Sequence, residues 1–555
     1  MRSIRLLSTV LIAASIATAA PVIQSVQNAA SNVVYRSLAL GGIFVIKGTG
    51  LGPPNISIDS KPFQNTSLSG TSIAVTAADG TNVKALMYYT SDSQVAALLP
   101  SNTPPGRGTF TVTYNGQTSA PQNHNIEMSS VGIFSIDSSG GGPAIVTYPD
   151  YSLVSPVKAA NCGGPNTTCG AANPGDVLII WATGLGPVSG GSDSSGAGLG
   201  KNMPNVPLTL YLGGVQAPVS YQGRSGCCIG EDQIVFTVPN NVPTGCAVPL
   251  VVQIGTGQNT ISNTTVIPVA NGSRSCTPTN PALASSGAAN IQQAVTAGPI
   301  NLGILELHKN LNNNTGPGYF DQAKFTFIKT LSYAPGAQPF FLSFVDDQPL
   351  GTCLVYSNPN GNTSNPITDI APLNAGTNFT VKGPNGSVPL AGIPGQFKTM
   401  LSAAGAFLVP GSYTVTSNGG PDVGPINATL AIPTSPTLLT PQPSNNLTVT
   451  RANGMTFTWN PNSSNGHVEI QVASATDGTF NVGGVAVCTA PASAGSLTIP
   501  PYVMLALTSS NFTFLEFALG TQAAAAEALY TAKGLDFGMV QAFLDGVFFG
   551  GFTLQ

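Results

Sequence analysis

The chain has 555 residues, of which only 7% are charged, and its 18 Lys plus Arg against 22 Asp plus Glu give a net charge of −4. Soluble proteins ordinarily have about 25% charged residues, so the predicted surface is polar but largely uncharged, and it lacks the basic stripe that a nucleic-acid partner requires. Apolar residues make up 42% of the chain, which excludes a disordered protein, and the length suggests about three to five domains.

The first 19 residues have the features of a secretory signal peptide. Arg2 and Arg5 precede the apolar segment Leu6–Ala17, and Ala17 with Ala19 fits the small-x-small rule for cleavage after Ala19. This segment is shorter than the about 20 residues that span a membrane, and no later segment is long and apolar enough. We therefore expect a mature chain without a transmembrane segment, secreted or held at the cell surface by non-covalent contacts.

Two copies of one glycine turn follow apolar segments. GTGLGP at 48–53 follows GGIFVIK, and ATGLGP at 182–187 follows GDVLIIW. This pair aligns at an offset of 134 residues, and a second pair of segments, beginning at Gln94 and Gln233, aligns at an offset of 139. Two anchors in the same order predict tandem homologous domains, with Thr49 equivalent to Thr183 and Gln94 equivalent to Gln233. The apolar segments 43–46 and 177–180 should be buried on both faces.

The glycines of these turns suit either a phosphate loop or a structural strand end. A phosphate loop needs a helix directly after the glycines, so that backbone amides meet the anion. Here the residues that follow cannot start an amphipathic helix, and no Lys-Ser/Thr pair is present after the turn. We therefore predict a structural role, through positive φ or close backbone approach, for Gly50, Gly52, Gly184 and Gly186.

The same segments carry a family resemblance. GGIFVIKGTGLGP, NPGDVLIIWATGLGP, VPLTLYLGGVQAPVSYQG and DQIVFTVPNNVPTG are similar to the uncharacterised repeat domain of exported proteins of Solibacter-type acidobacteria, over about residues 22–270. The chain departs from that pattern at Ala96 and Val235, where the family usually has Asn, and by the insertion RSGCCIGE at 224–231. The first copy also resembles the immunoglobulin-like IPT/TIG domain. The resemblance implies immunoglobulin-like sandwiches and carries no assigned activity.

Downstream of the repeats the pattern remains that of β-structure. Phe325 and Phe327 alternate on one face, and residues 411–433 predict two strands around an Asn-Gly-Gly turn. Residues 455–460 and 467–473 also alternate. This pattern predicts that Trp459, Val468, Ile470 and Val472 point inward and that Glu469 and Gln471 point outward. A helix is expected only at 521–532, and the chain should end in a strand.

The sequence therefore predicts an all-β chain of tandem immunoglobulin-like β-sandwich domains after a cleaved signal peptide. Residues 271–290 are rich in Ser, Asn, Pro and Ala without periodicity, which is typical of a linker. The expected units are a signal peptide (1–19), repeat 1 (20–130), repeat 2 (131–270), the linker (271–290), a β-rich third domain (291–432) and a β-sandwich fourth domain (433–555).

Motifs for catalysis or metal binding are not found in the sequence. It contains no G-x-S-x-G, no HExxH and no CxxC, and its three His are scattered. The adjacent carboxylates Asp346-Asp347 and Glu231-Asp232 should point to opposite faces of a strand. Asp193 offers one carboxylate, whereas calcium sites gather several. We therefore expect no catalytic residue, cofactor or metal ligand.

Three functions are compatible with these features. The leading hypothesis is an exported, non-enzymatic protein that contacts extracellular polysaccharide or protein through the loops of its sandwiches. The second is an extracellular hydrolase whose site lies in the third domain, with His308, Asp346 and Asp347 as the first residues to test. The third is a structural spacer without a specific ligand.

The eight cysteines suit an oxidising compartment. Cys162 and Cys169 flank a turn-rich hexapeptide that brings its ends together, so they are expected to form a bond. Cys353 and Cys488 lie in different predicted domains, and the sequence assigns them no partner.

The adjacent Cys227 and Cys228 are the harder case. In an extended segment their side chains point to opposite sides, so each is expected to reach a different partner. Cys246 and Cys276 are the nearest candidates, which predicts two bridges that pin the inserted segment and the linker to repeat 2. The alternative is a bond between Cys227 and Cys228 with Cys246–Cys276 as the second.

Overall fold

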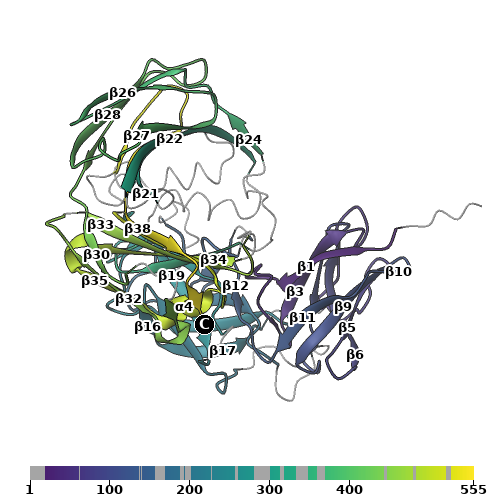
Figure 1. The fold of residues 1–555 in the computed structure, drawn as a ribbon. Helices are drawn as coiled ribbons and strands as arrows, with labels where there is room; N and C mark the ends of the chain where they lie inside the picture. Colours follow the sequence, from purple (N-terminus) through teal and green to yellow (C-terminus); the bar gives the residue numbers. More distant parts are fainter. Residues whose placement is uncertain are drawn as a thin grey trace, which may run out of the picture.

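The structure of the chain is a computed structural model (Figure 1). It describes residues 19–61, 63–136, 138, 140–156, 169–187, 193, 202–226, 228–256, 260–279, 301–312, 318–332, 348–358, 369–442, 447–464, 466–478, 483–519 and 527–555. The predicted all-β fold of tandem immunoglobulin-like sandwiches is confirmed. Within these residues, the helical elements are short: α4 (Pro501–Ala506), η2 (Arg451–Asn453) and η3 (Ala492–Ala494).

Repeat 1 is a sandwich of two sheets. One sheet has the order β1 (Val22–Asn28), β3 (Ile43–Thr49), β8 (Gln94–Leu98), β7 (Leu86–Thr90) and β4 (Ser57–Ile58). The other has the order β2 (Leu38–Ala39), β11 (Gln122–Glu127), β9 (Gly106–Tyr114), β5 (Thr71–Thr76) and β6 (Asn82–Lys84), with β10 (Gln117–Thr118) beside β9. Alternating apolar residues of both sheets, such as Phe44 and Phe110, fill the core between them.

Repeat 2 has the same layers. Its first sheet has the order β12 (Gly132–Ile133), β14 (Val177–Thr183), β18 (Asp232–Thr237) and β17 (Val219–Arg224), with β13 (Val146–Thr147) also beside β14. Its second sheet has the order β16 (Val215–Ala217), β15 (Leu208–Leu212), β19 (Gly245–Ile254) and β20 (Thr265–Val269). Each of the two repeats keeps to its own pair of sheets, drawn in purple to blue and in teal in Figure 1.

The two repeats agree in strand register as well as in topology. Lys47 pairs with Gln94 between β3 and β8, and Trp181 pairs with Gln233 between β14 and β18, as the sequence alignment requires. The next strand pair has a register shift at the corresponding position in each repeat. Because bulges of this kind are positional features of a fold, their agreement supports the tandem repeat.

The apolar segments that define the repeat are buried nearly as predicted. Residues 43–46 are all buried, and so are residues 178–180. Val177 is the exception, with 42% of its surface exposed, because it stands at the first position of β14, where the strand enters from a surface turn.

The rest of the chain is organised around one ten-stranded sheet. Its main order is β23 (Cys353–Asn358), β34 (Gly483–Pro491), β33 (His467–Ala475), β36 (Phe512–Leu519), β38 (Phe537–Gly550), β21 (Asn301–Asn312), β22 (Gly318–Ser332) and β24 (Asp369–Pro372). β27 (Gln396–Ser402) pairs with β22, and β37 (Glu527–Leu529) pairs with β38.

The two halves of this sheet pack against different layers. β21, β22, β27 and β38 share a core with the sheet β26 (Gly386–Ala391), β25 (Asn378–Gly383), β28 (Gly411–Ser417) and β29 (Ile426–Ile432), at the top of Figure 1. β33, β34 and β36 share a core with α4 and the sheet β30 (Thr437–Thr440), β32 (Met455–Asn460) and β35 (Ser496–Ile499). A short pair, β31 (Thr448–Val449) and β39 (Thr553–Leu554), lies beside this second core.

This sheet corrects the boundary predicted between residues 432 and 433. β21, from the predicted third domain, pairs in parallel with β38, from the predicted fourth, with Leu305 opposite Val540. β23, from the third, pairs with β34, from the fourth. The segments 291–432 and 433–555 are therefore not independent sandwiches. Pairing between strands so far apart in the chain leaves no local signature in the sequence.

Several local predictions can be compared with the structure. Phe325 and Phe327 are fully buried, and Trp459 is buried with its Nε1 donating to the Ala492 carbonyl oxygen at 2.6 Å. Glu469 was expected outside but is only 4% exposed, because both faces of this ten-stranded sheet are covered at β33.

The helix predicted at 521–532 is wrong where it can be checked. Residues 520–526 lie outside the described residues, and β37 follows as a strand paired with β38. The edge of β38 supplies backbone partners, and this tertiary pairing outweighs the helical preference of alanine. The strand pair predicted at 411–433 is present as β28 paired with β29. The strand predicted at the chain end is present as two successive strands, β38 and β39.

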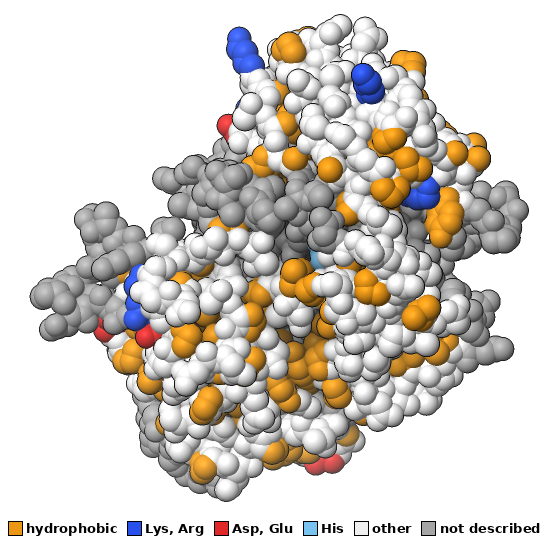
Figure 2. All heavy atoms as spheres, turned by 90° about the vertical axis from the view of Figure 1, so that its left-hand side faces the viewer, with side chains coloured by type: hydrophobic (Ala, Val, Ile, Leu, Met, Phe, Trp, Pro, Cys, Tyr) orange, Lys and Arg blue, Asp and Glu red, His pale blue; other side chains and the backbone are white. Residues whose placement is uncertain are grey.

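The described part of the predicted linker is attached to repeat 2. Arg274 forms an ion pair with Asp176, and its carbonyl oxygen accepts a hydrogen bond from the Ala171 amide at 2.9 Å. Repeat 2 in turn stacks on the C-terminal part of the chain, with the Tyr211 and Tyr502 ring centroids 4.2 Å apart. On the face in Figure 2, charged side chains are few and scattered, in keeping with the composition.

Candidate functional site at the junction of the two repeats

The two glycine turns have the backbone geometry that their sequences predict. Gly50, Gly184 and Gly186 have φ values of 66°, 99° and 126°, the region that favours glycine. Gly52 has no positive φ, but a Cβ there would lie 2.1 Å from Thr90 Oγ1. The four glycines therefore shape strand ends, by conformation or by close contact.

The turn of repeat 2 has a further role, because repeat 1 packs directly against it. The Ser130 amide donates to the Gly184 carbonyl oxygen at 2.9 Å, and a Cβ on Gly184 would lie 2.2 Å from the Ser130 carbonyl oxygen. The Thr183 hydroxyl accepts from the Ile43 amide at 2.8 Å and donates to the Gly230 carbonyl oxygen at 2.6 Å. This turn therefore forms part of the junction between the repeats.

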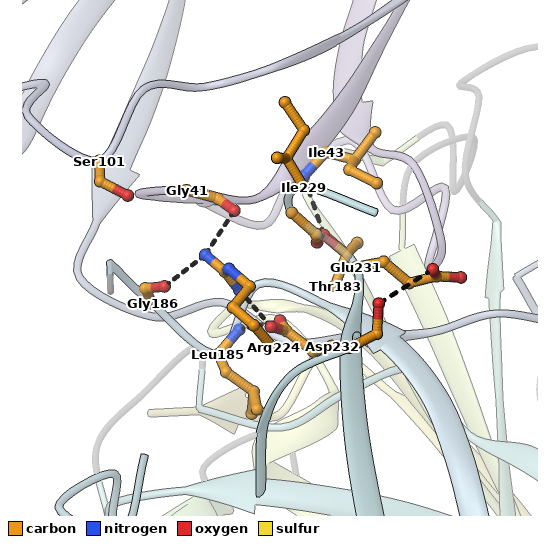
Figure 3. Close-up of polar contacts among 12 residues, drawn as sticks. Gly41, Ile43, Ser101, Thr183, Leu185, Gly186, Arg224, Ile229, Glu231 and Asp232 are labelled. Carbon is orange, nitrogen blue, oxygen red and sulfur yellow. Dashed lines mark hydrogen bonds and ion pairs between the residues drawn. The ribbon is translucent and has the colours of Figure 1, made fainter. Parts of the chain in front are cut away.

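A buried ion pair occupies the centre of this junction (Figure 3). Arg224 pairs with Asp232, and their side chains are 3% and 0% exposed. Arg224 Nη2 also donates to the carbonyl oxygens of Gly41 in repeat 1, at 2.7 Å, and Gly186 in repeat 2, at 2.8 Å. The second Asp232 oxygen accepts from the Leu185 amide at 2.8 Å. The guanidinium thus joins both repeats through one group.

Burial shapes the electrostatics of the pair. It raises the pKa of Asp232, an effect that the Arg224 guanidinium and the Leu185 amide oppose. A Cβ on Gly41 would lie 2.4 Å from Arg224 Nη2, so only glycine fits where the guanidinium approaches the backbone of repeat 1. The ion pair therefore favours this one arrangement of the two repeats, because a buried charge is strongly destabilising when its partners are absent.

The insertion in repeat 2 provides an apolar contact as well. Ile229 packs into a buried cluster with Ile43, Leu86 and Leu98 of repeat 1. The Tyr88 hydroxyl donates to the Ile229 carbonyl oxygen, and burial raises the pKa of that hydroxyl. The residues RSGCCIGE, recognised in the sequence only as a departure from the first copy, are therefore a docking segment.

A second extra segment of repeat 2 contacts the same partner. In repeat 1 the single strand β1 pairs with β3. In repeat 2 two short strands, β12 and β13, pair with the equivalent strand β14, and the chain between them loops away from the sheet. From this excursion the Ser138 carbonyl oxygen accepts from Asn32 Nδ2 at 2.8 Å. Asp193 also reaches repeat 1, accepting from the Ser101 amide and hydroxyl at 2.6 and 2.7 Å. The carboxylate considered for calcium is thus used in an inter-repeat contact.

The cysteine pairing differs from the leading prediction. Cys246 is bonded to Cys276, with their Cα atoms 5.2 Å apart. The predicted bonds of these two residues to Cys227 and Cys228 are therefore wrong. The reason is sheet pairing: β19 begins at Gly245 opposite the end of β20, and the chain leaving β20 passes beside Cys246. The alternative Cys246–Cys276 bond is therefore present.

The remaining cysteines are placed as follows. Cys353 and Cys488 face each other on β23 and β34 and form a bond that the sequence did not predict, because their strands were assigned to separate domains. Cys169 and Cys228 are each disulfide-bonded. Cys162 and Cys227, which the sequence analysis also named, lie outside the described residues.

The residues of the hydrolase hypothesis are only partly described. Asp346 and Asp347 lie outside the described residues. His308 Nε2 lies 3.8 Å from Glu306 Oε1, too far for a hydrogen bond, and Glu306 forms an ion pair with Lys324 at 2.8 Å. Burial acts to raise the pKa of Glu306, but His308 and Lys324 outweigh it and hold the pKa below its usual value. Glu306 is thus an ionised structural partner.

The described part of the chain shows neither a cluster of metal ligands nor a helix that could span a membrane. No group of three or more His, Cys, Asp or Glu side chains is placed to hold a metal ion there. Within the same residues, no helix combines the length and apolar character needed to cross a membrane.

Comparisons with known proteins give no family for this chain. No family model matches it, and no curated protein matches it. Among solved structures, it is similar to a tetra-tandem repeat from the extending region of a large adhesion protein, with 11% identity, coverage of 97% of this chain and 100% of that one, and a TM-score of 0.14.

Two other solved structures show similarity of the same kind. SGBP-B, from a complex xyloglucan utilization locus in Bacteroides uniformis, has 10% identity over 70% of this chain and 87% of that one, with a TM-score of 0.16. Gamma-CGTase from alkalophilic Bacillus clarkii has 12% identity over 70% of this chain and 37% of that one, with a TM-score of 0.17. Scores this low do not establish a shared overall arrangement.

Proposed function

We propose that this chain is an exported, non-enzymatic protein that works at the cell surface or outside the cell by binding polysaccharide or protein. The observation that carries the proposal is the junction of the repeats, where the buried ion pair Arg224–Asp232 and the docked Ile229 hold two sandwiches in one orientation. A fixed orientation presents the loops of both sandwiches to a partner as one preorganised surface, which reduces the entropic cost of binding.

The disulfides support the exported location. Cys246–Cys276 and Cys353–Cys488 are both formed, and such bonds persist mainly in oxidising compartments. Two sequence features also favour export: the signal-like residues 1–19, and the resemblance of residues 22–270 to an exported repeat domain.

The first test is direct binding by the purified mature chain. A glycan array and a pull-down with whole cells should each be run beside a chain unfolded by reduction and heat as a control for adhesion without specificity. We expect saturable binding to at least one glycan or cell-surface protein. If the folded chain binds no glycan and no cell-surface protein more strongly than the unfolded control does, the structural-spacer hypothesis replaces this proposal.

The hydrolase hypothesis has its own test. Polysaccharide and ester substrates should show no turnover above a buffer control, and neither Asp346→Asn nor Asp347→Asn should change that result. Turnover that Asp346→Asn or Asp347→Asn abolishes, while thermal stability is kept, would replace the binding proposal with an enzymatic one.

A further inference from the structure

An exposed aromatic ring, Tyr151, lies beside a half-buried one, Trp181, on the outer face of repeat 2. Tyr151 follows β13 and has 66% of its surface exposed. Its ring centroid lies 6.1 Å from that of Trp181, and the two planes are inclined at 40°. Trp181 belongs to β14, where its neighbours Ile180 and Ala182 are fully buried in the core, so its own side chain is on the outer face.

The turn holds Tyr151 in a conformation that is unfavourable for tyrosine. Its φ is 66°, in the left-handed region that suits glycine or asparagine and that bulky residues rarely adopt. The Tyr151 amide donates to the Tyr148 carbonyl oxygen, and the Tyr148 amide donates to that of Ser152, both at 2.9 Å. These hydrogen bonds hold the turn while the Tyr151 ring stays mostly exposed, and strained residues of this kind cluster at ligand-binding positions.

Trp181 is fixed and is particular to the second repeat. Its Nε1 donates to Thr147 Oγ1 at 3.1 Å, which sets the orientation of the indole ring. The equivalent position in repeat 1 is Lys47, as the shared strand register shows. The chain has 2 Trp, and the other, Trp459, is 2% exposed in a core.

The groups beside the rings are polar, with the hydroxyls of Ser152 and Thr147 and the carboxylate of Asp150. Next to Tyr151, the Ser152 hydroxyl donates to the Asp150 carboxylate at 2.6 Å. Arg274 contacts the Tyr148 hydroxyl on the buried side of this turn. Its charge is paired with Asp176. The pair therefore combines two tilted apolar faces with hydrogen-bonding groups at the margin and no unpaired cation among the contacts described here.

This combination matches a sugar chain better than a protein surface. Two aromatic side chains bury about 150–250 Å² each, well short of the about 800 Å² per partner of a stable protein interface. Pyranose rings offer flat faces of C–H groups for stacking and a rim of hydroxyls for hydrogen bonds, and the scarcity of charge favours a neutral chain. We propose that Tyr151 and Trp181 form a platform for a neutral polysaccharide, an assignment that rests on the proposed function.

The test compares the mature full-length chain with two variants by affinity electrophoresis in gels that contain hydroxyethylcellulose, galactomannan or amylose, with polygalacturonate as the anionic comparison. Tyr151→Asn removes the ring and suits the left-handed backbone, and Trp181→Lys introduces the residue that repeat 1 has at this position. We expect both variants to bind at least one neutral polysaccharide about tenfold or more weakly than the natural chain. The melting temperature of Tyr151→Asn should be equal or higher, since its strain is relieved.

The outcomes separate this inference from the proposed function. If the natural chain binds a neutral polysaccharide and both variants bind it within twofold, the platform is wrong and the proposed function stands. Tighter binding of polygalacturonate than of every neutral chain overturns the neutral assignment. If no polysaccharide in the gel retards the chain, while the chain captures a cell-surface protein, the platform is wrong. The protein-binding part of the proposed function then stands. If nothing binds, both are wrong.

Discussion

The ion pair at the repeat junction can be tested with Arg224→Met, a substitution of similar length that removes the charge. It leaves the Asp232 carboxylate buried at 0% exposure and withdraws the donor from the carbonyl oxygens of Gly41 and Gly186. Removing one partner of a buried pair costs about 3–5 kcal/mol, chiefly because the other charge is left uncompensated. We expect the junction to lose stability by that amount.

The assay is hydrogen exchange at amides that report on the junction itself. The Ile43 amide of repeat 1 donates to Thr183 Oγ1 of repeat 2, and the Ser101 amide donates to the Asp193 carboxylate, so both are protected by these bonds only while the repeats are docked. A loss of 3 kcal/mol or more corresponds to exchange that is faster by about 100-fold or more.

Two comparison variants make the result specific. Arg274→Met breaks an ion pair whose side chains are 26% and 18% exposed, which should cost only about 1 kcal/mol and leave the junction amides unchanged. Combining Arg224→Met with Asp232→Leu removes both charges and should recover most of the lost protection. Exchange of the Ile43 and Ser101 amides within threefold of the natural chain in Arg224→Met would show that the ion pair does not hold the repeats together.

Three further predictions follow from other parts of the fold. Gly184→Ala should lower the melting temperature more than Gly50→Ala, although both have positive φ, because a Cβ would lie 2.2 Å from a backbone oxygen at Gly184 and 3.8 Å from its nearest neighbour at Gly50; equal losses would contradict the docking role of the second turn. Burial lowers the pKa of His467 from 6.5 to about 3, so the unfolded chain takes up a proton that the folded chain refuses. Stability should therefore fall as the pH drops from about 6.5 toward 3, by up to about 1.4 kcal/mol per pH unit, and His467→Gln should flatten that slope in urea titrations; an unchanged slope would exclude His467 as the source. Replacing Cys353 and Cys488 by Ala opens a loop of 135 residues and should cost about 5 kcal/mol in urea unfolding under oxidising conditions, whereas an unchanged midpoint would show that strand pairing alone holds β23 in place.

Local sequence patterns were sufficient wherever a structural feature depends on neighbours in the chain. Alternation placed Phe325, Phe327 and Trp459 in cores, and the two anchor segments established the repeat and its register because homologous segments keep the same pairing. The glycine turns were also readable, since positive φ and close approach are properties of the turn itself.

Features built from distant segments were decided only by the tertiary structure. The sequence marked RSGCCIGE as an insertion, but nothing local showed that Arg224 would reach the backbone of Gly41 across the junction. An insertion that places Arg224 and Glu231 beside Asp232, in a chain with only 7% charged residues, was the one available signal. The aromatic pair of Tyr151 and Trp181 was likewise invisible, because two different segments supply its rings.

The ten-stranded sheet shows the physical reason most clearly. β21 and β38 pair along their length although more than 200 residues separate them, with Asn301 and Asp536 joined by a hydrogen bond at a sequence separation of 235. Composition and periodicity determined that these segments are strands, because side-chain alternation is a local property. Which strand lies beside which is decided by the shared burial of two cores, so the Cys353–Cys488 bond and the loss of the 432/433 boundary appear only when the whole sheet is assembled.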